Sequence, residues 1–377
     1  MSEFQYVGFR AIDAPLDDDQ LHYMESQSSR GEITRWSFDN TYHYGDFRGN
    51  AVEMLRRGYD LHLYYANFGI RKVMIRLPQG LPIPKARCAK YLDGESVVWQ
   101  ADAKGSAGIL TISASTDSGA LDELWGVEEY LERIVGVRQQ LIDGDLRPLY
   151  VAWMCGCQSD QVDPNSAYEP PVPAGLVESS GPISGMLDYF DLSPFVLAAA
   201  AEQSPPLRQR ADQRVAMVDW LNSLDTATSH KWLLRFLTGE PTATRSACLQ
   251  TFRKSRKLPP WPVIKGTRTL TQLVQRANEL AEEAQIREGK RKERARRKRV
   301  TDMARSPQKY LDEVNEHVAM RGRVHYDQAA QILSEIREAI GGEKGDKVSR
   351  KHAAHLRKKH PTLNMLTGAL RRKGLLS

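Results

Sequence analysis

The stretch TYHYGDFRGN, at residues 41–50, is the densest run of side chains that could carry out acid–base chemistry. In an enzyme, His43 could act as a general base, Asp46 could orient it and Arg48 could bind an anion. The same residues also suit a turn, because the two glycines bend the backbone and Asp46 can accept bonds from backbone amides and pair with Arg48. We favour the turn, since a polar loop alone is a weak indication of catalysis.

A second group of residues could hold Mg²⁺ for phosphodiester hydrolysis, which needs clustered carboxylates. Asp93, followed by Asp102 and Lys104, resembles the acid and acid–x–Lys pattern of restriction nucleases. The first acid lies only nine residues before the second, so a loop acid and an exposed hairpin tip explain these residues better. A hydrolase using His43 and Asp46, or a nuclease using Asp102 and Lys104, stays as the alternative to a non-enzymatic protein.

The cysteines and histidines do not form a metal-binding pattern. Cys155 and Cys157 have no second pair nearby, whereas a structural zinc site needs four ligands, so we expect small buried thiols at a helix end. Three histidines lie in residues 352–360, but their basic neighbours would repel a divalent cation; these neighbours are Lys351, Arg357, Lys358 and Lys359. We expect a basic helix face there and no metal. The motifs G-x-x-x-x-G-K-[ST] and G-x-G-x-x-G are missing, so we expect no cofactor.

Charge is divided unevenly along the chain. Residues 1–250 hold 22 Lys/Arg and 33 Asp/Glu, whereas residues 251–377 hold 31 and 14. The densest basic run comprises Arg291, Lys292, Arg294, Arg296, Arg297, Lys298 and Arg299. Because no aromatic side chain interrupts this run, we expect it to contact the backbone of a nucleic acid rather than its bases. The alternatives are an acidic protein partner and a solvated helix that pairs with the acidic half of the chain.

The elements that must position these residues can be predicted from periodicity and turn residues. Residues 1–118 alternate in the manner of an α+β domain. We expect strands at 4–12 and 31–38, hairpins at 59–78 and 97–115, and helices within 13–29 and 50–58. These elements predict a mostly antiparallel sheet with helices packed on one face.

The rest of the chain is predicted to be all α. Residues 119–256 form a helical domain, interrupted by a proline-rich connector at 158–183 that we expect to lie over the surface. Residues 257–267 are a second, linking break. Residues 268–304 form a long basic helix with an apolar stripe at its start, and residues 305–377 form a small helical tail.

The bulk composition indicates a protein that does not contact a membrane. No stretch approaches 18 uncharged apolar residues, and the first residues lack the order of a signal peptide. The chain of 377 residues is therefore expected to be cytoplasmic and to hold two or three domains.

Parts of the sequence resemble a family of bacterial hypothetical proteins. The resemblance rests on an opening strand ending in Ala-Ile-Asp, a Gly-Asp-Phe turn, an Ala-Asn strand and an Arg-Leu-Pro run; the residues are Ala11, Ile12, Asp13, Gly45, Asp46, Phe47, Ala66, Asn67, Arg76, Leu77 and Pro78. It covers roughly the first 200 residues, and the tail is similar to that of bacterial SWIM zinc-finger proteins, which are often genomic neighbours of the family. The resemblance implies no activity, and a SWIM zinc-finger protein as a partner. The chain lacks the Cys/His set of a zinc finger, so no zinc carries over.

These observations favour a bacterial, non-enzymatic interaction protein. Its N-terminal domain would dock another protein, and its basic C-terminal helix would contact nucleic-acid backbone or an acidic protein.

Overall fold

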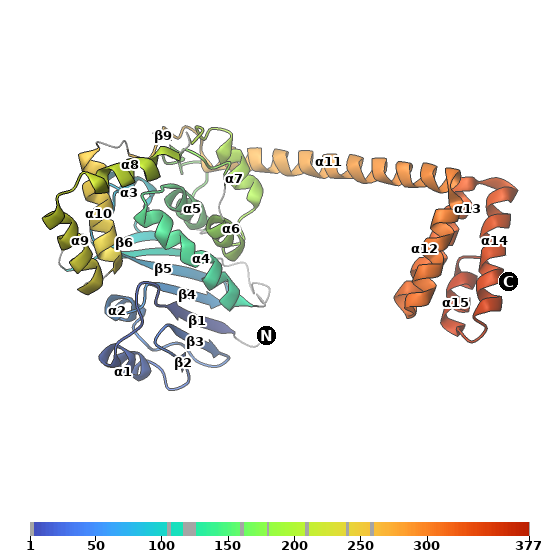
Figure 1. Cartoon of the computed structure of the whole chain (residues 1–377), viewed down its shortest axis with the longest axis horizontal. Helices are drawn as coiled ribbons and strands as arrows, with labels where there is room; N and C mark the ends of the chain where they lie inside the picture. Colours follow the sequence, from blue (N-terminus) through green and yellow to red (C-terminus); the bar gives the residue numbers. More distant parts are fainter. Residues whose placement is uncertain are drawn as a thin grey trace. The chain divides into compact units, whose positions relative to one another are not determined.

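The computed structural model describes residues 4–103, 107–115, 126–158, 162–178, 181–207, 211–238, 241–256 and 260–376. The chain divides into two compact units, residues 1–281 and 282–377 (Figure 1). The first unit contains an antiparallel sheet and packed helices, and the second is helical. The predicted α+β class is confirmed. Among the described residues, no helix has the length and apolar content needed to cross a bilayer.

Seven strands of the described residues form one antiparallel sheet in the order β2-β3-β1-β4-β5-β7-β6. Their bounds are β1 Gln5–Arg10, β2 Glu32–Ile33, β3 Ser37–Tyr42, β4 Leu61–Ala66, β5 Ile70–Leu77, β6 Val97–Ala101 and β7 Gly108–Ser115. Strand β1 lies between β3 and β4, so that Tyr6 pairs with both Thr41 and Tyr65. The two predicted hairpins are β4–β5 and β6–β7.

The single strand expected at residues 31–38 is wrong, because the chain turns between β2 and β3. The hydroxyl of Thr34 accepts hydrogen bonds from the backbone amides of Trp36 and Ser37, at 3.1 and 2.9 Å. A threonine side chain that binds the backbone two or three residues ahead closes a tight turn and interrupts a strand.

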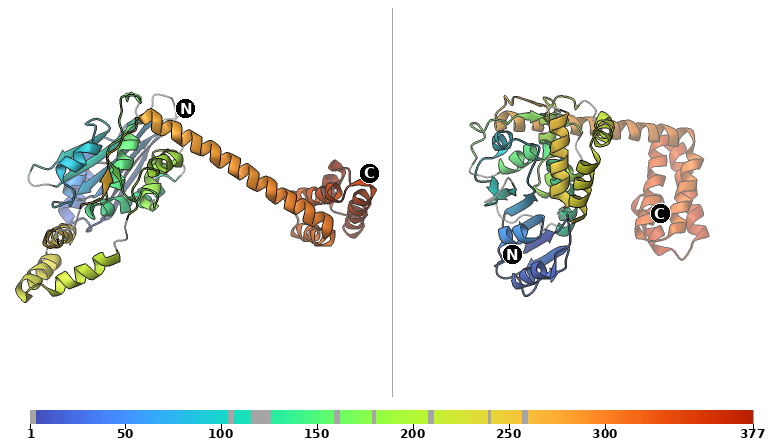
Figure 2. Two further views of the ribbon diagram at one scale, coloured as in Figure 1. Left: turned by 90° about the horizontal axis from the view of Figure 1, so that it is seen from above. Right: turned by 60° about the vertical axis from the view of Figure 1, so that its left-hand side comes forward.

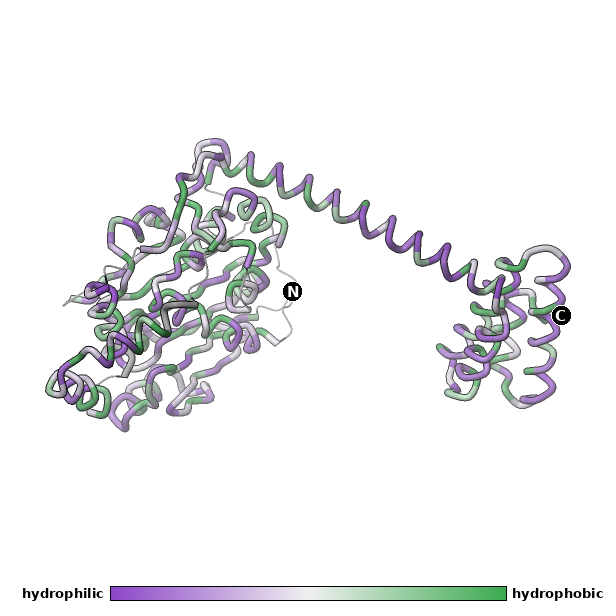
Figure 3. The backbone as a smooth tube through the Cα atoms, turned by 45° about the horizontal axis from the view of Figure 1, so that its top comes forward, coloured by the Kyte–Doolittle hydropathy of each residue, from purple (hydrophilic) through white to green (hydrophobic). Residues whose placement is uncertain are grey.

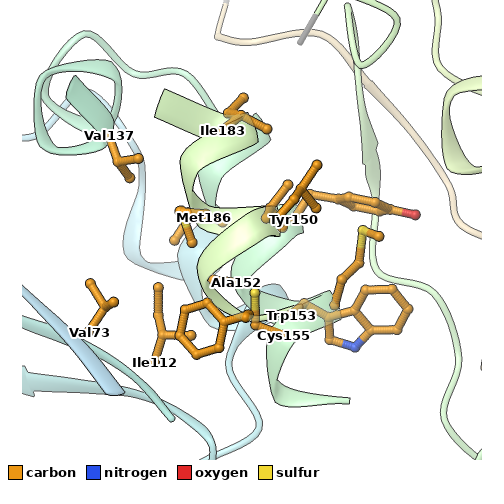
Figure 4. Close-up of a cluster of buried hydrophobic side chains, with 14 of the residues drawn as sticks. Val73, Ile112, Val137, Tyr150, Ala152, Trp153, Cys155, Ile183 and Met186 are labelled. Carbon is orange, nitrogen blue, oxygen red and sulfur yellow. The ribbon is translucent and has the colours of Figure 1, made fainter. Parts of the chain in front are cut away.

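Helices cover both faces of the sheet, so the expectation that they lie on one face is wrong. On one face, Leu63, Val73 and Ile112 pack into a core with α4 (Val127–Ile142), α5 (Arg147–Gly156) and α6 (Gly181–Tyr189). Figure 4 shows part of this core, where Val73 and Ile112 lie beside residues of the helices such as Val137, Ala152 and Met186.

The opposite face packs against α1 (Asp18–Ser26) and α2 (Ala51–Arg57), using Val7, Phe9 and Met74. Helix α2 begins as the sequence predicts, because the side chain of Asn50 accepts a hydrogen bond from the amide of Glu53. Strands that are apolar on both faces require cover on both, and on this face the helices that connect β1 to β2 and β3 to β4 supply it.

The remaining elements of the first unit are short helices and a strand pair. Their bounds are α3 Lys85–Cys88, η1 Ala89–Tyr91, α7 Pro194–Ala201, α8 Ala211–Asn222, α9 Thr226–Thr238, α10 Pro241–Ser255, β8 Val172–Pro173 and β9 Val263–Ile264. Strands β8 and β9 pair with each other, a small addition to the region predicted as all α.

The proline-rich connector lies at the surface only in part: residues 163–166 are exposed, whereas residues 169–176 are mostly buried, contrary to the expectation. Val172 and Leu176 are buried, and so is the charged side chain of Glu169. The carboxylate of Glu169 accepts hydrogen bonds from Arg268 at 2.7 and 2.9 Å and from the hydroxyl of Tyr150. Burial is tolerated because the polar groups of the connector find partners within the protein.

The second unit is the predicted helical cluster. It contains α12 (Pro307–Met320), α13 (Arg323–Ile340), α14 (Gly342–Lys359) and α15 (Asn364–Arg372), together with the end of α11 (Leu270–Arg305). Its core gathers one or more buried side chains from each helix, among them Met303, Val314, Leu333, Leu356 and Leu370.

A buried ion cluster joins α4 to the loops that follow β1 and precede β4. The side chain of Arg138 is 4% exposed and donates to both carboxylate oxygens of Asp13, at 2.7 and 2.6 Å, and to the backbone carbonyl of Arg76. Its guanidinium also lies 2.9 Å from Asp60. Burial raises the pKa of the Asp60 carboxyl, and the charge of Arg138 opposes that rise.

We predict that Arg138→Met lowers the free energy of unfolding by about 3–5 kcal/mol, because it leaves two carboxylates without their cation. The loss should be larger at about pH 7 than at about pH 5, since the raised pKa of Asp60 lets the folded variant bind a proton that the unfolded chain releases. Urea titrations followed by tryptophan fluorescence measure both values.

The control is Arg133→Met on the same helix, whose surface partner is Asp188. It should cost about 0–1 kcal/mol at either pH. If the two variants lose the same free energy of unfolding, or if the loss for the Arg138 variant does not depend on pH, the ion cluster does not behave as a set of buried charges.

Candidate nucleic-acid interface

The basic run forms the solvent-exposed half of α11. Every residue from Gln285 to Asp302 is exposed, and the hydropathy colouring of Figure 3 shows this half of the helix as hydrophilic. Lys and Arg are good helix formers, and two pairs of the favourable Glu-to-basic i,i+4 type support the helix. These pairs are Glu288–Lys292 at 2.8 Å and Glu293–Arg297 at 2.9 Å.

Four of the seven predicted contact residues have no carboxylate within ion-pair distance in the described part of the chain. They are Arg291, Arg294, Arg296 and Lys298. Arg291, Arg294 and Lys298 are spaced i, i+3 and i+7, which places them on one side of the helix over about 10 Å of its length. We define these four residues as the free basic set.

Arg299 differs from the free basic set because carboxylates of the second unit partly neutralise its charge. Its guanidinium lies 3.4 Å from the carboxylates of Glu313 and Glu335, and 5.3 Å from the centre of the Tyr310 ring. These contacts join the end of α11 to α12 and α13. Its charge is therefore partly used within the fold.

The end of α14 is a second exposed basic region of the same unit. Lys351, Arg357, Lys358 and Lys359 are all exposed. The last three lie in the final turn of the helix, where cations also favour the helix dipole. Of the histidines among them, His352 bonds to Asn315 at 3.2 Å, and burial lowers its pKa. A neutral His352 adds no charge to this surface at neutral pH.

The structure places the first catalytic candidates in the turn between β3 and α2. His43 is exposed, with its ring 5.7 Å from that of Phe4, and the carboxylate of Asp46 accepts a hydrogen bond from the side chain of Gln5 at 2.9 Å. Arg48 is exposed, and among the described residues no ion pair joins it to Asp46. A base and the acid that orients it must share a hydrogen bond, and His43 and Asp46 do not share one in this described stretch.

The candidate nuclease residues lie apart. The carboxylate of Asp93 accepts bonds from the backbone amides of Glu95 and Val97, just before β6. Asp102 follows β6 and pairs with Arg56 at 3.3 Å. The five residues of β6 separate the two acids by about 15 Å, too far for one metal ion to bind both. Lys104 lies outside the described residues.

The cysteines have the environments expected for thiols at a helix end. Cys155 is buried in α5, and burial raises the pKa of its thiol. Cys157 follows α5, and burial and the charge of Asp93 raise its pKa to about 12. Such thiols are poor nucleophiles at neutral pH. No group of three or more His, Cys, Asp or Glu side chains suited to a metal ion occurs in the described parts of the chain.

The described residues of the first unit line at least two pockets. One, of about 640 Å³, is lined by residues that include Tyr6, Arg10 and Asp39, whose polar atoms bond to one another. The other, of about 410 Å³, is apolar and is lined by residues that include Leu187 and Leu197. Neither contains any of the candidate catalytic residues.

Sequence reasoning assigned no role to α9, although this helix exposes several large apolar side chains. The signal was present in the run HKWLLRFL at residues 230–237, which combines leucine and aromatic residues with two cations and no acid.

Comparison with family models, with curated proteins and with solved structures gives no match.

We predict that Arg299→Ala destabilises the second unit by about 1 kcal/mol, because two carboxylates and a ring lose their cation. Hydrogen exchange of the amides of α12 and α13 in the full chain measures this loss. Arg294→Ala is the matched control and should leave exchange unchanged. If both variants have the same effect, Arg299 is as free as its neighbours.

Proposed function

We propose that the second unit binds the phosphate backbone of nucleic acid through the basic half of α11, with the end of α14 adding contacts. Residues 282–377 hold 24 Lys/Arg and 13 Asp/Glu, whereas residues 1–281 hold 29 and 34. A polyanion is therefore attracted to the second unit and repelled by the first.

The observation that supports this proposal most strongly is the free basic set. Clustered cations repel one another, and within the described chain no carboxylate lies at ion-pair distance from Arg291, Arg294, Arg296 or Lys298. Binding of phosphates removes this repulsion and releases the counterions condensed on the nucleic acid. No aromatic residue lies between residues 285 and 309, so the segment offers no platform for base stacking. We therefore expect little dependence on base sequence.

The test is the binding of the full chain to a fluorescent duplex, measured by anisotropy between about 50 and about 300 mM salt. Changing the free basic set to Gln should weaken binding and reduce the slope of log K against log salt by about 3 to 4, because each lost phosphate contact contributes about 0.9. Arg357→Gln with Lys358→Gln should reduce the slope by less than 2.

The control removes the same number of charges from the first unit. Arg30, Arg48, Lys85 and Lys90 are exposed cations there, and changing all four to Gln should leave the slope unchanged. An absence of binding at about 50 mM salt, or an equal effect of the two quadruple variants, contradicts the proposal. Poly-glutamate that competes as well as duplex at equal charge would instead indicate an acidic protein as the partner.

A further inference from the structure

Helix α9 carries an unusually apolar exposed face. Leu234 and Leu237 are 63% and 75% exposed, and Leu233 and Phe236 are 58% and 48% exposed. Figure 2 shows α8, α9 and α10 as a group at the margin of the first unit. Neighbouring large apolar side chains on one helix are seldom left in water unless another surface covers them.

The polar side of α9 is cationic. At about 100° per residue, the apolar side chains from Trp232 to Leu234 cover an arc of about 200°, and Lys231 and Arg235 occupy the remaining arc. The helix contains no acidic residue. An apolar arc flanked by Lys and Arg is typical of helices that lie in the interface of an anionic bilayer.

The contacts that hold α8 and α10 in place do not use the apolar face of α9. Trp220 of α8 packs on Phe252 of α10 with ring centres 5.4 Å apart, and the guanidinium of Arg253 donates to the backbone carbonyl of Asp143. These contacts join α8 to α10, and α10 to the end of α4. The large apolar side chains from Leu233 to Leu237 are all exposed, so the other helices of the first unit leave this face uncovered.

We propose that α9 binds the surface of a phospholipid bilayer with anionic headgroups. Leu233 and Leu237 would enter the acyl boundary, and Lys231 and Arg235 would lie at the level of the phosphates. Trp232, which is half-buried and has the Arg235 guanidinium 5.8 Å from its ring centre, suits the same interfacial level. With 13 residues, α9 is too short to span a bilayer and lies along its surface. An exposed apolar face with cations at its margin matches the apolar boundary and the phosphates of an anionic bilayer.

The experiment is flotation of the full chain with vesicles of phosphatidylcholine alone, or mixed with phosphatidylglycerol. The chain should float more completely with the mixed vesicles than with pure phosphatidylcholine, because headgroup charge adds to the apolar insertion. Leu233→Gln with Leu237→Gln should weaken binding by about tenfold or more, since two apolar insertions are lost. Val177→Gln with Met365→Gln changes two other exposed apolar residues and should have no effect.

The basic half of α11 could also attract anionic vesicles, and salt separates the two causes. At about 500 mM salt the attraction of exposed charges is screened, whereas apolar insertion persists. Flotation should therefore continue at that salt, survive the α11 quadruple variant and disappear in the double leucine variant. The double leucine variant should bind duplex normally, so failure of this proposal leaves the nucleic-acid proposal intact.

Three results would overturn the lipid proposal. The first is flotation that depends on the α11 cations and not on the leucines. The second is equal flotation with both kinds of vesicle. The third is a dimer, seen by sedimentation without lipid, that the double leucine variant abolishes while no flotation occurs, because a second copy of the chain would then cover α9. Near-ultraviolet circular dichroism should confirm that the variant is folded.

Discussion

The carboxylate of Glu169 is the buried charge on which the packing of the first unit depends. It is fully shielded from water and is held by two hydrogen bonds from Arg268 and one from Tyr150. A buried carboxylate without its cation would be strongly destabilising. Arg268 also donates to the carbonyl of Ala199 at 2.7 Å. One ion pair therefore fixes the connector, α5 and α7 together, and it does so two residues before α11 begins.

This anchoring explains how α11 can change character along its length. Its first turns bury Leu273 and Ala277 against the first unit, and its end buries Met303 in the core of the second. Between them the helix has no core to join, so its stability must come from helix-forming residues and from local pairs of Glu with Lys or Arg. Glu288 and Glu293 form one ion pair each, so most of the basic residues of this segment have no carboxylate at ion-pair distance. The same residues that keep the segment helical in water keep it available to a polyanion.

The sequence was informative where structure is local and misleading where it depends on distant partners. The hairpins, the Asn50 cap and the long helix follow from turn residues and periodicity, and all are present. The place of β1 between β3 and β4 requires pairing with β4, which lies about 50 residues further along the chain, and periodicity does not encode such a pairing. The prolines of the connector predict an extended segment at the surface. They give no sign that Glu169 is buried by its partner Arg268, which lies 99 residues away in the sequence. The candidate interface shows the same limit. The basic run can be found in the sequence, but the ion pairs of Arg299 with Glu313 and Glu335 cannot be predicted from it.

Polar residues that have a structural partner differ from exposed residues that have none, and this difference indicates which surfaces could be functional. Asp13, Asp46 and Arg76 each have a structural bond in the first unit: Asp13 and the carbonyl of Arg76 accept hydrogen bonds from Arg138, and Asp46 accepts one from Gln5. Residues occupied in this way are explained by the fold alone. By contrast, the free basic set and the leucines of α9 contribute little to packing and are left facing solvent. Exposed groups that lower solubility or repel one another, and that pack against nothing in the fold, are best explained by a partner surface that covers them.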